Sequence, residues 1–60
     1  MVSPYTDPAE LKQFLPIMTK DDIEDLLKTI DQRLRVESDG NKIMRLLDNR
    51  DILEKALENY

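Results

Sequence analysis

The sequence predicts a small all-α domain, and three observations carry that prediction. Aliphatic residues recur at the three- and four-residue spacing of amphipathic helices. The 60 residues include one glycine and three prolines, too few chain breakers for a disordered segment. Two helix-capping sequences are present, DPAE at residues 7–10 and TKDD at residues 19–22. We therefore expect residues 1–60 to form a single helical domain that begins with an extended arm at residues 1–6.

The first helix is predicted at about residues 8–15. Asp7 is placed to accept hydrogen bonds from the free amides of its first turn. Pro16 ends the helix, because proline lacks an amide donor and disfavours helical angles in the residue before it. A helix of about two turns is not stable alone, so we expect Phe14 and Leu15 to pack on the rest of the chain.

The strongest helix is predicted at residues 20–36. Thr19 is its cap, and Asp22 stands where an acidic side chain completes a capping box. Five aliphatic residues fall within an arc of about 100° on its helical wheel: Ile23, Leu26, Leu27, Ile30 and Leu34. We expect this helix to end near Val36, and Gly40 to reverse the chain with a positive φ.

A third helix is predicted at about residues 42–59, and its apolar stripe is uneven. On a straight helix Arg50 falls in the middle of the face that Leu46 and Leu47 define. The apolar residues after Arg50 centre about 90° away from that face. Two interpretations follow. The helix is continuous with Arg50 at an edge or an interface, or it breaks or kinks near Asp48–Arg50, with Asp48 capping a new helix.

The short connection between the helices at 20–36 and 42–59 predicts an antiparallel helical hairpin, which the helix at 8–15 would cap. A lone core in a chain below about 70–80 residues rarely supplies more than about 3–5 kcal/mol of stability. We therefore expect a homodimer in which two hairpins pair into a four-helix core.

Several kinds of chemistry are excluded by composition. The chain contains neither cysteine nor histidine, so disulfides, thiolate or imidazole metal sites and Ser-His or Cys-His nucleophile pairs cannot form. The loop before Gly40 lacks the carboxylates that a calcium loop needs at its first and twelfth positions. The acidic residues at 21–25 suit a solvated first helical turn. We expect no enzyme, no catalytic residue, no cofactor and no metal.

Nucleic acid and membranes are not the expected partners. Lys42, Arg45 and Asn49 share one side of the third helix and would form the reading face of the alternative, a small dimeric DNA-binding regulator. Acidic residues surround them, and the net charge is −4, whereas nucleic-acid binders need a basic footprint. No apolar run approaches the roughly 18 residues of a membrane span. Residues 1–4 do not open a signal peptide, so we expect a cytoplasmic protein.

The function expected first is that of a non-catalytic interaction module, or a small regulator or inhibitor, that binds a partner protein. Its acidic character favours a partner with a basic surface. Several apolar residues do not fit on the inward faces, and an arginine suits an ion pair across an interface. The interaction candidates are Phe14, Leu15, Met18, Met44, Arg50, Ile52 and Tyr60.

Two sequence patterns resemble known adaptor families. LKQFLP at residues 11–16, followed by Leu46 and Leu47, resembles the hydrophobic-hydrophobic-Pro and di-leucine pattern of ubiquitin-binding CUE domains, over less than half of the chain. The helix predicted at residues 20–36 is longer than that fold implies. Residues 18–27 are similar to the capped acidic helices of docking domains from modular synthases. These resemblances imply a further alternative, a docking or ubiquitin-binding-like helical adaptor.

Overall fold

Three α-helices and one short 3₁₀-helix make up the structure, a computed structural model that describes residues 2–60. In chain order they are α1 (Pro8–Phe14), η1 (Leu15–Ile17), α2 (Lys20–Val36) and α3 (Gly40–Glu58). No strand occurs among residues 2–60, so the predicted all-α class is confirmed. Residue 1 of the predicted arm lies outside the described residues. In the part of the chain described, no helix is both long and apolar enough to span a bilayer.

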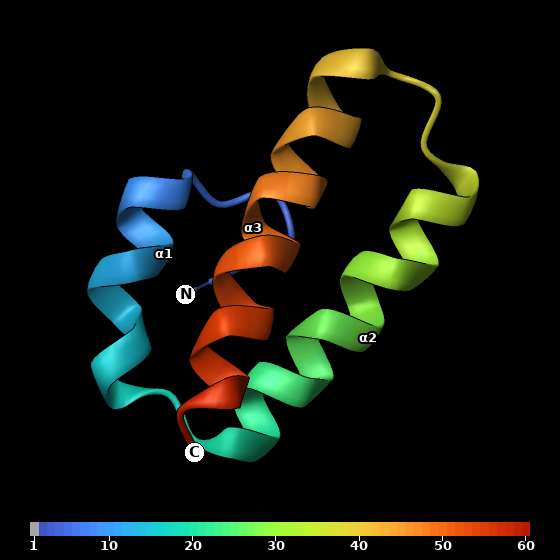
Figure 1. The fold of residues 1–60 in the computed structure, drawn as a ribbon. Coiled ribbons are helices and arrows are strands. Elements are labelled where there is room, and N and C mark those ends of the chain that lie inside the picture. Colours follow the sequence, from blue (N-terminus) through green and yellow to red (C-terminus); the bar gives the residue numbers. More distant parts are fainter. Residues whose placement is uncertain (1) are drawn as a thin grey trace.

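α3 is the element on which the other helices pack. Figure 1 shows α2 and α3 side by side and running in opposite directions, joined by residues 37–39. α1 lies against α3 as well, and η1 then leads the chain back to the start of α2, near the C-terminus (Figure 1). α1 and α2 therefore each pack mainly on α3.

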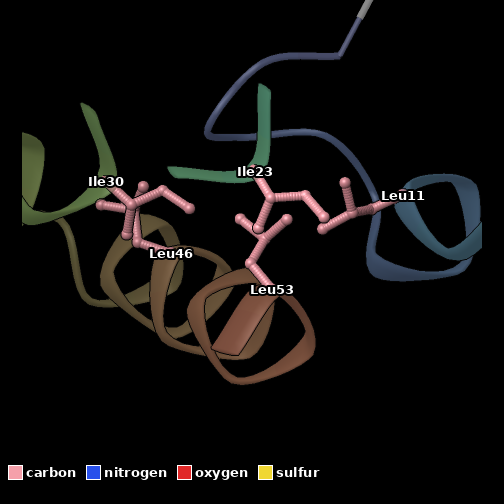
Figure 2. Packing of buried hydrophobic residues seen from close by; sticks show 5 residues of the cluster. All are labelled: Leu11, Ile23, Ile30, Leu46 and Leu53. Atoms are coloured by element: carbon pink, nitrogen blue, oxygen red, sulfur yellow. The ribbon is translucent and has the colours of Figure 1, made fainter. Parts of the chain in front are cut away.

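Five fully buried aliphatic side chains form the core, and they come from all three α-helices. Figure 2 shows the cluster in two parts: Ile30 of α2 meets Leu46 of α3, and Leu11 of α1 meets Ile23 and Leu53. Burying a side chain of this size contributes about 1.5–3 kcal/mol, so these contacts dominate the stability of the domain. Leu11 is the residue that attaches the short α1 to the other two helices.

The starts of α1 and α2 are capped as the sequence predicts. Asp7 Oδ1 accepts from the Ala9 amide at 2.9 Å. Thr19 Oγ1 accepts from the Asp22 amide at 3.1 Å, and Asp22 Oδ2 accepts from the Thr19 amide at 3.0 Å, which completes the capping box. α2 has its predicted bounds, whereas α1 stops at Phe14 and tightens into η1 one residue before Pro16.

α3 begins two residues earlier than predicted, because Asp39 caps it. Asp39 Oδ1 accepts from the amides of Asn41 at 2.9 Å and Lys42 at 3.2 Å. Gly40 is consequently the first helical residue and its φ is not positive, so the predicted reversal at Gly40 is wrong. Glu37 and Asp39 turn the chain instead, with extended angles (φ −75°, ψ 131° and φ −80°, ψ 120°).

α3 runs without interruption through Asp48–Arg50, so the interpretation in which Asp48 caps a new helix is wrong. Its inward face is centred on Leu46, Asn49 and Leu53, all fully buried. The sequence prediction had treated Asn49 as outward and therefore centred the face too far toward Leu47, which is 46% exposed. A face centred on Asn49 includes the apolar residues on both sides of Arg50, so one continuous helix can bury them.

Candidate interaction site

A groove of about 430 Å³ lies between the α1–η1 segment and α2. It exists because α1 and α2 both pack on α3 and leave a space between them. We call it the α1–α2 groove. It is lined by Val2, Phe14, Ile17, Met18, Asp22, Asp25, Leu26 and Thr29. Most of this lining is apolar, so the groove is suited to apolar side chains from another molecule.

Ile17 stands at the lip of the α1–α2 groove and is 76% exposed. It belongs to the 3₁₀ turn η1, where the ring of Pro16 restricts the backbone just before it. Phe14 and Met18, on either side of this turn along the chain, are half-buried in the same wall. The local sequence therefore presents a large aliphatic side chain to solvent from a stiff segment.

Tyr60 fastens the end of this wall to the C-terminal end of α3. Its hydroxyl donates to the backbone carbonyl of Met18 at 2.6 Å, although the residue as a whole is 64% exposed. Met18 lies between η1 and the cap of α2, and its backbone is extended (φ −84°, ψ 137°). The bond thus ties the η1–α2 junction to a residue 42 positions away.

The charged side chains that line the groove belong to α2. Asp22 and Asp25 are exposed and lie three residues apart, on one side of the helix. The carboxylate of Asp22 is held by the capping box. Thr29 donates its hydroxyl to the Asp25 carbonyl at 3.1 Å, a bond internal to the helix. Among the described lining residues there is no lysine or arginine, so this edge of the groove is acidic.

The N-terminal arm is a docked turn rather than the predicted extended segment. The Thr6 amide donates to the Ser3 carbonyl at 3.1 Å, which closes the turn. Asn49 Nδ2 donates to the carbonyls of Pro4 at 2.9 Å and Thr6 at 2.8 Å. These bonds hold the arm on α3, and the arm in turn brings Val2 to the α1–α2 groove.

Asn49 and Arg45 are therefore bonded to the arm, and Asn49 is not exposed beside Lys42 as a DNA-reading stripe on α3 requires. Asn49 is fully buried and cannot reach a base edge. Arg45 Nη1 donates to the Tyr5 carbonyl at 3.3 Å. The buried Oδ1 of Asn49 has no hydrogen-bond partner among the described residues.

Tyr5 connects the arm to the segment that joins α2 and α3. Its hydroxyl donates to Glu37 Oε1 at 2.7 Å. This hydrogen bond, helped by partial burial, raises the pKa of the Tyr5 phenol above its ordinary value. The same bond is the main cause that lowers the pKa of the Glu37 carboxyl, against a smaller opposing effect of burial.

The structure brings three of the predicted interaction residues together and separates the others. Phe14 and Met18 line the α1–α2 groove, and Tyr60 is bonded to Met18. Leu15 and Ile52 are half-buried and pack against the core. Met44 is 63% exposed on α3 and does not belong to the groove.

Arg50, the last of these candidates, forms ion pairs within the chain. Its Nε lies 3.3 Å from Asp31 Oδ1 of α2 and 2.9 Å from Glu54 Oε1, one turn further along α3. All three side chains are about half exposed, so each pair contributes at most about 1 kcal/mol. The arginine sits at the edge of α3 that faces α2, as the continuous-helix interpretation requires.

Sequence reasoning missed Ile17, Asp25 and Thr29 as parts of one site. Ile17 falls between Pro16 and the cap of α2 and so belongs to neither apolar stripe, which was a usable signal of exposure. Asp25 and Thr29 gave no such signal, because acidic and hydroxyl side chains are ordinary on an exposed helix face.

The residues behind the CUE-like resemblance are spread over the molecule. Leu46 is in the core, Leu47 is on the surface of α3, and Phe14 is at the α1–α2 groove. Comparison of the chain with protein-family models, curated proteins and solved structures finds no match. The function is therefore inferred from the geometry of this chain alone.

Proposed function

We propose that the protein is a non-catalytic interaction module that binds a partner protein in the α1–α2 groove. The observation that supports this is the groove of about 430 Å³ with the 76% exposed Ile17 at its lip. A large aliphatic side chain beside an apolar hollow gains free energy when another apolar surface covers it. The function needs no reacting group, only a surface that a partner covers.

The groove is held in shape by contacts that lie outside it. Tyr60 fastens the Met18 end, and Asn49 fastens the arm that carries Val2. A partner therefore meets a surface that is already ordered and loses little free energy in arranging it. The short helix α1 can form one wall because its buried Leu11 attaches it to the core.

A pair of photocrosslinking variants tests this proposal. A photoreactive amino acid replaces Thr29, which lines the α1–α2 groove, or Lys28, the preceding exposed residue of α2 that does not line it. In an extract of the organism that makes the protein, we expect the Thr29 variant to form a discrete adduct that excess unmodified protein suppresses. We expect no such adduct from the Lys28 variant. Equal adducts from both positions would argue against the groove.

We also propose that two copies associate through α3, so that their helical hairpins form a four-helix core. Met44 and Leu47 are 63% and 46% exposed and lie about one turn apart on this helix. A two-fold interface brings the same residues of both copies together, so one apolar strip on one helix is sufficient. The small core of five aliphatic residues favours this added burial.

A further inference from the structure

We infer that the partner segment in the α1–α2 groove carries an apolar side chain next to a lysine or arginine. The inference rests on the proposed function and adds the chemistry of the partner. It starts from the two kinds of surface that the groove combines: apolar side chains from the α1–η1 segment and carboxylates from α2.

The apolar part of the site calls for an apolar anchor. Phe14 and Leu26 face the hollow from opposite walls, and Ile17 extends the apolar surface to the lip. A polar side chain placed between them would lose its hydration without gaining a hydrogen bond. An aliphatic or aromatic side chain loses nothing comparable and covers Ile17 at the same time.

The acidic part of the site calls for a cation close to that anchor. Asp22 and Asp25 lie on the wall formed by α2, and the groove lining described contains no positive side chain that would neutralise them. Residues 20–28 of α2 carry four carboxylates and two lysines, so the potential along this wall is negative on balance. A guanidinium or ammonium at this edge gains charge-assisted hydrogen bonds, whereas a carboxylate would be repelled.

The charge of the whole chain points in the same direction. The net charge of −4 attracts a basic segment during approach and repels a second copy of this acidic surface. A basic segment of another protein is therefore favoured over self-association as the occupant of the groove. Self-association remains assigned to Met44 and Leu47 on α3.

A library of short random peptides displayed on phage and selected on the immobilised full chain tests this inference. We expect the enriched peptides to share an apolar residue with a lysine or arginine beside it. Asp25→Asn should weaken their binding about threefold to tenfold, because it removes one carboxylate from the groove edge. Glu24→Gln is the matched control: it removes the same charge one residue away, outside the lining, and should change binding less than twofold.

The results distinguish a partner without a basic residue from the absence of binding in the α1–α2 groove. Enriched peptides that lose binding in Ile17→Ser but carry no basic residue would overturn this inference and leave the groove as an interaction site. Equal effects of Asp25→Asn and Glu24→Gln would overturn it as well, because the charge effect would then not be local. A selection that yields no groove-dependent peptide also contradicts it, and the crosslinking comparison then decides the proposed function separately.

Discussion

Asn49 is the residue that attaches the N-terminal arm to α3. It is fully buried on the inward face of α3, and its amide holds two carbonyls of the arm. The sequence did contain a signal of this, since Asn49 follows Leu46 by three residues and precedes Leu53 by four. A polar residue between two core leucines is buried only if another segment supplies its partners, and here the arm supplies them.

Replacing Asn49 by alanine should lower the free energy of unfolding by about 1–3 kcal/mol, because it removes the donor from two carbonyls. Chemical denaturation followed by circular dichroism measures this change. Asn41→Ala is the control, since Asn41 is exposed and bonds Asp39 through its backbone amide, which alanine keeps. It should change stability by less than about 0.5 kcal/mol, and equal losses in the two variants would mean that the arm is not held by Asn49.

The Tyr5–Glu37 hydrogen bond should make stability depend on pH in a defined window. The Glu37 pKa is lowered, so its contribution is complete above the ordinary value of 4.5 and is lost as pH falls through the lowered value. The Tyr5 pKa is raised, so its contribution is complete below 10.0 and is lost as pH rises through the raised value.

Tyr5→Phe keeps the ring and removes the hydrogen bond, and melting curves across pH then isolate its contribution. The wild type should melt above Tyr5→Phe by a constant margin between these limits, and the margin should shrink toward acid and toward alkali. A margin that does not vary with pH would show that the hydroxyl bond to Glu37 does not form in solution.

Among the helices, the start of α3 can be tested by a single substitution at Gly40. Gly40 is the first helical residue, its φ is not positive, and a Cβ built on it meets nothing within 4 Å. Gly40→Ala should therefore raise the free energy of unfolding by about 0.4–1 kcal/mol, because alanine restricts the unfolded chain. Denaturation midpoints measure the difference. A loss of stability would instead indicate that Gly40 adopts the positive φ that the sequence predicted.

The features that could be predicted from the sequence are those that depend on residues close together in the chain. The caps of α1 and α2 depend on neighbours in the sequence, so Asp7, Thr19 and Asp22 could be assigned without the structure. The face of α3 was harder to centre, because the spacing of Asn49 from the core leucines indicates burial only if a distant segment, here the arm, supplies its hydrogen-bond partners. The cap of α3 was missed because glycine after Asp39 matches a chain reversal as well as a helix start.

The candidate site was only partly predictable for the same reason. Phe14 and Met18 stood out as apolar residues near helix ends, and both line the α1–α2 groove. The groove itself depends on how α1 and α2 pack on α3, which involves residues far apart in the sequence. Asp25 and Val2 become parts of the site only through that packing.

At the scale of the whole molecule, we expect a homodimer at micromolar concentration. Light scattering over a dilution series should give about twice the chain mass of 7.1 kDa. Leu47→Glu, at a site already 46% exposed, should give the monomer mass while the helical circular dichroism spectrum is retained. A monomer mass for the wild type up to millimolar concentration would contradict the four-helix assembly.

The proposed function assigns partner binding to the α1–α2 groove rather than to exposed apolar surface in general. Ile17 and Val36 provide a matched pair, since they are 76% and 75% exposed and only Ile17 lines the groove. Neither Ile17→Ser nor Val36→Ser should change the free energy of unfolding by more than about 0.5 kcal/mol.

The decisive measurement is the dissociation constant, by calorimetry, of each variant for the partner identified by crosslinking. We expect Ile17→Ser to weaken binding about tenfold and Val36→Ser to leave it unchanged. Equal affinities of the two variants would show that the α1–α2 groove is not the binding site.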